Sequence, residues 1–147
     1  MKYTEIVPGE ILKQYVRYYY LFESDTKVEM EDIVFPGGQV EIIFNLSDAT
    51  WKTASNNIFQ DTPKIELWGQ ITRPLPVKAV GRHNKMLGIK FFPHTAAVFF
   101  REEIGALNDQ VNDTAAILGR SIEQLHSMLL EETEVNKQIT LIEDYLL

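Results

Sequence analysis

Two carboxylates stand in apolar stretches of the sequence that alternate like β-strands. Glu41 lies in Val-Glu-Ile-Ile-Phe-Asn-Leu (40–46), and Glu66 lies in Ile-Glu-Leu-Trp (65–68). If both side chains faced the interior of a barrel, they could act as a general acid and a general base. The alternative is that both face solvent opposite the core face, because buried carboxylates need partners. We assign no catalytic residue on this pattern.

The other residue types that commonly carry out chemistry have no productive spacing. None of His83, His94 and His126 lies two, three or four residues from another, so we expect no metal site. The absence of cysteine excludes thiolate zinc sites, iron–sulfur clusters, disulfides and a Cys nucleophile. The sequence has no Gly-x-Ser-x-Gly, no Gly-rich phosphate loop and no His-Glu-x-x-His. We therefore expect neither enzymatic activity nor a cofactor.

Aromatic residues are concentrated before Pro93. Rings combined with a few polar groups are typical of a small-ligand pocket, although rings at strand spacing also form an ordinary core. The candidates for ligand binding are Arg17, Tyr19, Glu41, Phe44, Trp68, Lys90 and Phe91. Arg17 or Lys90 would anchor an anionic group. Residues of one parity share a strand face, which groups Arg17 with Tyr19 and opposes Glu41 to Phe44, so the candidates cannot all line one site in regular strands.

The elements that must position these residues are strands in the first part of the chain. Period-two alternation of apolar residues favours half-buried antiparallel strands. The expected strands are 15–22, 28–35, 40–46, 65–71, 77–80 and 85–92. Turns are expected at 36–38 and 81–84, with a longer polar loop at 53–63. Prolines 74 and 76 argue against a regular central strand at 73–76.

After Pro93 the apolar spacing changes to the 3.6-residue period of helices. We expect a helix at 94–103 with Gly105 after it, a short turn from Asp113 to Leu118 ended by Gly119, a helix opening with a capping box at 121–124, and a last helix from Val135. The dimerisation candidates on the last two helices are Ile122, Leu125, Leu129, Val135, Ile139, Ile142 and Leu146. The alternative is that these faces pack onto the β-region, since amphipathic helices usually cover their own core.

The order of elements predicts an α+β fold: a small antiparallel β-barrel or sandwich followed by C-terminal helices. We expect one domain over 1–147, with a β-rich part at 1–92 and a helical part at 93–147. The apolar ending at Leu147 has no helix stop signal, and we interpret it as a cut within a longer protein.

Charge and hydropathy limit the partners. Fourteen basic and twenty-one acidic residues give a net charge of −7. Because nucleic-acid binding depends on neutralising phosphates, we do not expect this chain to bind DNA or RNA alone. The sequence has no signal-peptide pattern and no apolar run near the roughly 20 residues of a membrane span. We expect a cytoplasmic protein with no membrane association.

Three motifs in order suggest a family. They are Pro8 with the aromatic opening at 15–20, Phe-Pro-Gly-Gly-Gln-Val-Glu-Ile-Ile-Phe-Asn-Leu at 35–46, and Leu-Gly-Ile-Lys-Phe-Phe-Pro-His-Thr-Ala-Ala-Val-Phe-Phe at 87–100; Gly69-Gln70 with Thr72-Arg73-Pro74 fits the middle of the pattern. From about Pro8 to Leu147 the chain resembles the N-terminal domain of a subgroup of AraC-type bacterial transcriptional regulators. His94 departs from the glycine that this subgroup often has at that position.

The resemblance implies a cupin-like ligand-sensing or dimerisation domain of a homodimeric regulator. It implies that a small-molecule effector changes how a C-terminal helix-turn-helix module, absent from this chain, meets DNA. Two other functions are compatible with the residues. One is a stand-alone small-molecule binding protein, and the other is a small barrel enzyme that uses Glu41 or Glu66.

Overall fold

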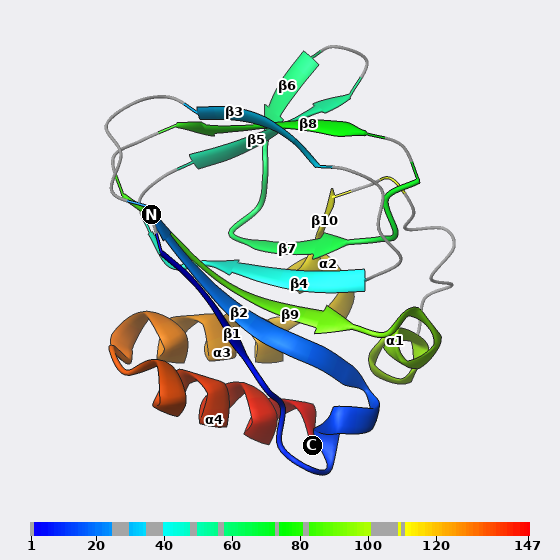
Figure 1. Cartoon of the computed structure of the whole chain (residues 1–147), viewed down its shortest axis with the longest axis vertical. Helices are drawn as coiled ribbons and strands as arrows, with labels where there is room; N and C mark the ends of the chain where they lie inside the picture. The colour runs from blue at the N-terminus through cyan, green and yellow to red at the C-terminus, as the bar shows by residue number, and fades with distance from the viewer. Residues whose placement is uncertain are drawn as a thin grey trace.

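Two β-sheets and a layer of helices stack on one another (Figure 1). The computed structural model describes residues 2–24, 30–34, 40–47, 50–55, 58–72, 74–80, 83–100, 109 and 111–147. In Figure 1 the smaller sheet lies above the larger one, and two C-terminal helices lie against the opposite face of the larger sheet.

The larger sheet has six strands among the described residues, and its neighbouring strands are antiparallel. In spatial order they are β1 (Lys2–Ile6), β2 (Val16–Ser24), β9 (Asn84–Phe91), β4 (Val40–Asn45), β7 (Ile65–Trp68) and β10 (Val111–Asp113). The smaller sheet has the order β3 (Met30–Val34), β8 (Leu75–Val80), β5 (Thr50–Ser55) and β6 (Ile58–Asp61). The helical segments are η1 (Leu12–Gln14), α1 (Pro93–Phe99), α2 (Thr114–Leu118), α3 (Arg120–Glu131) and α4 (Val135–Leu146).

The predicted α+β class is confirmed, and of its two alternatives the sandwich is the one that forms. The strands belong to two separate sheets rather than to one closed barrel. The predicted helical part is not wholly helical, because β10 at Val111–Asp113 adds an edge strand beside β7. No helix among the described residues is both long and apolar enough to cross a membrane.

The central strands of the larger sheet are buried on both faces. Alternate residues of β2, β4, β7 and β9 point toward the helices and form the main core, which includes Tyr19, Leu21, Ile42, Phe44, Leu67, Leu87, Ile89 and Phe91. The residues between them point toward the smaller sheet, where Tyr20, Ile43 and Trp68 pack with Val77 of β8. Each central strand therefore supplies one set of side chains to each layer.

The smaller sheet corrects one prediction and agrees with a second. The region 53–63 is not a long polar loop, since β5 and β6 pair there in antiparallel fashion. Pro76 lies within β8, opposite Ile33 of β3, whereas β5 pairs with β8 only from Val77 onward. At Pro76 the strand has no ladder partner on the β5 side, and a missing N–H is tolerated at such an edge position.

The helix starts and ends follow the prediction only in part. Asp113 caps α2 by accepting a hydrogen bond from the backbone N–H of Ala115, and Gly119 ends α2 with φ 80°. The capping box at 121–124 is wrong, because α3 begins at Arg120 and the Ser121 hydroxyl donates to the carbonyl of Leu118. The helix predicted at 94–103 is described as Pro93–Phe99, and Gly105 and the turn at 36–38 lie outside the described residues.

Polar contacts join α3 to the larger sheet and α4 to α3. His126 Nε2 lies 2.8 Å from the carbonyl oxygen of Asn45 at the end of β4. On α4, Gln138 Nε2 donates to the carbonyls of Leu129 and Glu132, at 3.0 and 2.8 Å. These bonds hold α4 to the C-terminal end of α3, where helix carbonyls have no intrahelical partner.

The dimerisation candidates lie in the interior of this chain. Ile122, Leu125, Leu129, Ile139 and Ile142 are buried in the main core, and Val135 and Leu146 are partly buried against it. These side chains cover the larger sheet, which is the alternative that we set against dimerisation.

Candidate functional site

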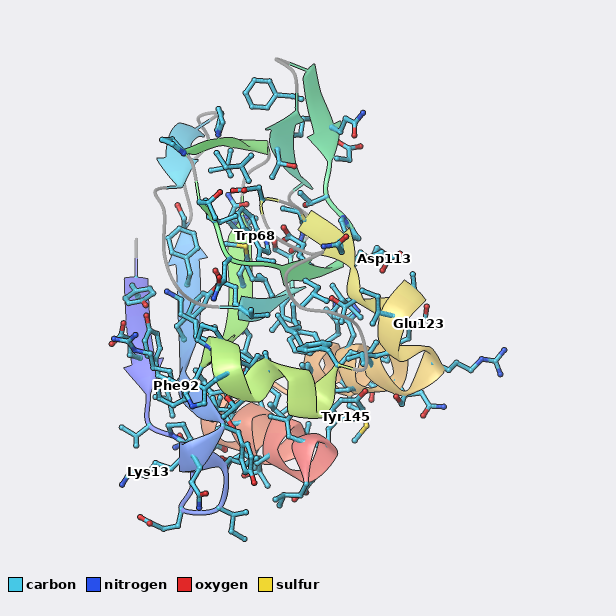
Figure 2. The ribbon with its side chains drawn as sticks, turned by 90° about the vertical axis from the view of Figure 1, so that its right-hand side faces the viewer. Lys13, Trp68, Phe92, Asp113, Glu123 and Tyr145 are labelled. Carbon is cyan, nitrogen blue, oxygen red and sulfur yellow. The ribbon has the colours of Figure 1, made fainter. Side chains whose placement is uncertain are left out.

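A cluster of polar and aromatic side chains lies on the face of the larger sheet that is turned toward the smaller sheet. We call it the inter-sheet cluster, and its members are Tyr18, Tyr20, Glu41, Glu66, Trp68 and Lys90. Figure 2 shows Trp68 on the side of the larger sheet toward the smaller sheet, whereas Tyr145 lies in the helical layer.

Strand register brings the members together. Tyr18 is paired with Lys90, Lys90 with Glu41, and Glu41 with Trp68, so four adjacent strands place these side chains in one row. Glu66 lies two residues from Trp68 on β7 and therefore on the same face. The cluster contains two carboxyls, one ammonium and three aromatic rings.

Gly88 creates the space for the ring of Tyr20. The two residues are register partners on β9 and β2, and a β-carbon built on Gly88 would overlap the Tyr20 ring. With no side chain in the way, the ring lies across β9, and the Tyr20 hydroxyl donates to Glu41 Oε2 on β4 at 2.8 Å. This glycine is required by a close approach rather than by a turn.

Lys90 places its ammonium against aromatic faces. Its Nζ donates to the Tyr18 hydroxyl at 2.9 Å and lies 5.1 Å and 5.5 Å from the ring centroids of Tyr18 and Tyr20. These distances are within the range of cation–π attraction. The same charge favours the ionised form of its register partner, Glu41.

Glu66 is the most deeply buried charged group of the cluster, with 2% of its surface exposed. Among the described residues its carboxyl accepts one hydrogen bond, from Trp68 Nε1 to Oε1 at 3.1 Å. Burial raises the pKa of Glu66 to about 8, the Trp68 bond opposes this shift, and the nearby charge of Glu41 adds to it. The Glu66 carboxyl is therefore mostly protonated at neutral pH.

Burial is also the largest cause of the pKa shifts of Glu41 and Tyr20. It raises the pKa of Glu41, against the lowering effects of the Tyr20 hydroxyl and of Lys90. It also raises the pKa of the Tyr20 hydroxyl, and the charge of Glu41 adds to that shift. Perturbed titratable groups that lie close together are a common mark of functional sites.

Residues from the smaller-sheet side close over the cluster. Ile71 and Val77 are buried against Tyr20 and Trp68. The segment that carries Ile71 is held by Asp109, whose N–H donates to the Gln70 carbonyl at 2.9 Å and whose carboxylate accepts from the Thr72 N–H at 2.7 Å.

The structure separates the predicted ligand-binding residues into two groups. Glu41, Trp68 and Lys90 come together in the inter-sheet cluster. Tyr19, Phe44 and Phe91 lie on the opposite face, fully buried in the main core under the helices. The parity rule anticipated this division of Glu41 from Phe44.

Arg17 corrects a parity prediction. Regular alternation groups Arg17 with Tyr19, but the register shifts between Val16 and Tyr18, so Val16 and Tyr19 are both buried and Arg17 is exposed. A bulge of this kind cannot be seen in the alternation itself. Arg17 is therefore not part of the inter-sheet cluster.

Three members of the cluster were not among the predicted ligand-binding residues. Tyr18, Tyr20 and Glu66 follow from the parity of Lys90, Glu41 and Trp68 once strand pairing is known. Glu66 was weighed as an acid or base, with solvent exposure as the alternative; its burial removes that alternative. The sequence contains no motif for these residues, and only the pairing of the strands shows that they lie together.

The described residues contain no group of three or more His, Asp or Glu side chains arranged to hold a metal ion. The carboxyls, ammonium and rings of the inter-sheet cluster can offer hydrogen bonds, charge and aromatic faces to a partner.

Comparison with protein families matches residues 4–113 to DUF6597, which is described as a domain of unknown function. The chain belongs to the DUF6597 family. The matched range runs from β1 to the end of β10 and so contains all six members of the inter-sheet cluster. No curated protein and no solved structure matches the chain.

Proposed function

We propose that this DUF6597 domain senses a small molecule at the inter-sheet cluster, as the regulatory domain of an AraC-type transcriptional regulator. The effector would act on a C-terminal helix-turn-helix module outside this chain. DNA binding would belong to that module, which is consistent with the net charge of −7.

The observation that supports sensing most strongly is the composition of the inter-sheet cluster. A structural core does not require two carboxyls, a lysine and hydrogen-bonding aromatic residues between two sheets, because each buried polar group costs free energy unless it is paired. Tyr18, Glu41 and Lys90 are partly exposed, whereas Glu66 and Trp68 are buried. The cluster thus combines access to solvent with a desolvated interior.

Strand β2 offers a route from the cluster to the C-terminal helices. Tyr20 bonds Glu41 on one face of β2, while its neighbour Tyr19 donates to Glu143 Oε2 of α4 on the other face, at 3.1 Å. The same carboxylate oxygen accepts the N–H of Gly9 at 2.8 Å. A ligand that moves Tyr20 would shift the α4 contact, provided that it binds the two arrangements with different affinity.

Thermal unfolding with a collection of metabolites tests the proposal. A ligand at one hundred times its Kd stabilises a folded protein by about 2.7 kcal/mol, or about 5–10 °C for a domain of this size. We expect some compounds to raise the unfolding midpoint in the wild type and to lose most of this effect in Tyr20→Phe and Trp68→Phe. Stabilisation that is unchanged in both variants would contradict sensing at this cluster.

Reading the gene beyond the Leu147 codon tests the regulatory part separately. A continuing frame with a basic double helix-turn-helix segment supports the regulator. A stop codon at that point would leave a stand-alone small-molecule binding protein as the function of the same cluster.

One observation favours a second function. A carboxyl with a pKa of about 8 beside a second carboxylate has the properties of a general acid paired with a base. On that hypothesis Glu41→Gln and Glu66→Gln would each abolish a turnover that the wild type performs on one of the stabilising compounds. Stabilisation without conversion of any compound favours sensing.

A further inference from the structure

The inter-sheet cluster has more acidic groups than basic ones. Two carboxyls, Glu41 and Glu66, face a single ammonium, that of Lys90. If both carboxyls ionise, the cluster carries a net charge of −2 + 1 = −1, counted over these three side chains. A ligand that balances this charge brings one positive charge.

The cluster already holds one ammonium in the manner in which proteins bind amines. Lys90 Nζ lies over the Tyr18 and Tyr20 rings and donates to a tyrosine hydroxyl. Elsewhere in the cluster, the Glu66 carboxyl lies beside the indole of Trp68 and accepts its hydrogen bond. Among the described residues, no lysine or arginine is bonded to Glu66. Aromatic faces beside carboxylates are typical of amine recognition.

The same face of the sheet has polar atoms without partners. Ser24 and Asn84 are register partners four residues from Tyr20 and Gly88, so alternation places them on the face of the cluster, about 13 Å along the strands. Both are buried, and Ser24 Oγ and Asn84 Oδ1 have no hydrogen-bond partner within the described part of the chain. Buried polar atoms are normally paired, but the register partners Phe22 and Met86 lie on the same face between these atoms and the cluster, so we do not include Ser24 and Asn84 in the amine site.

We propose that the ligand is a small molecule with a protonated amine, which binds between the Glu66 carboxylate and the aromatic rings of the cluster. This inference rests on the proposed sensing function and gives the chemical class of its effector. Glu41 remains paired with Tyr20 and Lys90, and Glu66 supplies the charge that meets the amine.

Binding of such a ligand releases a proton. Glu66 is mostly protonated in the free protein at pH 7, and an ammonium beside it favours the carboxylate. The apparent affinity then rises about tenfold per pH unit below the pKa of Glu66 and becomes constant above it.

Other charged groups near Glu66 come from each neighbouring strand. Glu41 is on β4, Lys90 and Tyr20 are on β9 and β2, and Asp113, the register partner of Glu66 on β10, is exposed and caps α2. Comparison of the wild type with Glu66→Gln shows how much of the proton release on binding comes from Glu66 rather than from these other groups.

Three probes on one molecular frame test the inference. Tyramine carries the amine, 4-(2-hydroxyethyl)phenol is its neutral counterpart, and 4-hydroxyphenylacetate is its anionic counterpart; all three end in a phenol hydroxyl. We expect only tyramine to raise the unfolding midpoint of the wild-type protein. Calorimetry at pH 7 in buffers of different ionisation enthalpy should show proton release on tyramine binding.

Variants assign the effect to Glu66. Glu66→Gln retains an acceptor for Trp68 Nε1 and should weaken tyramine binding about 10- to 100-fold, the range for loss of a hydrogen bond to a charged group. It should also abolish proton release. Glu123→Gln removes the same charge from an exposed position of α3 and should leave both quantities unchanged.

The outcomes separate this inference from the proposed function. If 4-hydroxyphenylacetate or the neutral probe stabilises the protein as much as tyramine does, the amine class is wrong while small-molecule sensing stands. If none of the three probes stabilises it, the amine inference is also overturned, and the metabolite collection decides on sensing. Tyramine binding that is unchanged in Glu66→Gln would overturn the assignment to this carboxyl.

Discussion

Single residues of the inter-sheet cluster show how far a local environment changes side-chain chemistry. Glu66 and Glu123 are the same residue type, but Glu66 lies between two sheets with 2% of its surface exposed, and Glu123 lies on the outside of α3. Desolvation makes the carboxylate form of Glu66 costly. This contrast makes stability measurements informative without knowledge of any ligand.

Glu66 should make the free energy of unfolding depend on pH. Its pKa is about 8 in the folded protein against an ordinary value of 4.5, so the folded state binds more protons between these values. The free energy of unfolding should fall as pH rises from 4.5 to 8, by at most about 1.4 kcal/mol per pH unit from this group. In Glu66→Gln the decline should be smaller, with the part due to Glu41 remaining, as measured by urea unfolding at several pH values.

Glu123→Gln is the matched control, because it removes a carboxylate that is exposed. It should retain the decline of the wild type. Equal slopes for Glu66→Gln and the wild type between pH 5 and pH 8 would contradict a raised pKa of Glu66.

Gly88 should tolerate no side chain while Tyr20 is present. Gly88→Ala puts a methyl group where the Tyr20 ring lies, and overpacking of this kind costs about 1–3 kcal/mol. In a Tyr20→Val background the same substitution should cost much less, because the ring is gone. Equal costs in both backgrounds, measured by denaturant unfolding, would show that the ring is not the obstacle.

Among the elements, alternation in the sequence predicted the central strands well. β4, β7 and β9 were expected because their apolar residues recur at every second position over at least part of each strand, and β2 was expected because its residues are aromatic and β-branched. The edge strands β1 and β10 and the pair β5 and β6 were missed, since their residues are polar and their strand conformation depends on pairing with a neighbour.

The candidate site was predictable only in part for the same reason. Glu41, Trp68 and Lys90 could be named from residue type and parity, but Tyr20 and Glu66 join them through register and through the space at Gly88. The exposure of Arg17 depends on a bulge at Val16 and Tyr18, which alternation does not reveal. Sequence patterns give the faces of strands, and tertiary pairing decides which faces meet.

The junction of α3 with α4 should depend on Gln138. Its side-chain amide donates to two carbonyls at the end of α3, and Gln138→Leu removes both bonds. We expect a loss of about 1–3 kcal/mol, the cost of leaving buried acceptors unpaired. Gln124→Leu makes the same change at an exposed position of α3 and should alter the free energy of unfolding by at most about 0.5 kcal/mol. Similar effects of the two variants would contradict this role of Gln138.

The apolar face of α4 is buried within one chain, which predicts how a substitution there changes the free energy of unfolding. Ile142→Ala should cost about 2–5 kcal/mol, as large-to-small changes in a core do. The loss should be the same at low and high protein concentration, since the face contacts its own sheet. A loss that depends on concentration would instead indicate that Ile142 contributes to an interface between copies.

At the scale of the whole molecule, the larger sheet lies between two layers and packs against both. Helices α3 and α4 cover one face and the smaller sheet lies over the other (Figure 1). Because residues of β2 alternate between the layers, a change at Tyr20 affects a strand that also carries Tyr19 and its bond to α4. This arrangement is what the proposed sensing function requires of the fold.

The most direct test of that function is the indole N–H signal of Trp68 in a proton–nitrogen correlation spectrum, followed during titration with tyramine and with each compound that raises the unfolding midpoint. The chain has two tryptophans, and Trp68→Phe assigns the signal. Sensing at the inter-sheet cluster requires a saturable shift of the Trp68 signal that parallels the thermal stabilisation. It is contradicted if compounds that stabilise the protein leave this signal in place, or if no compound stabilises the protein at all.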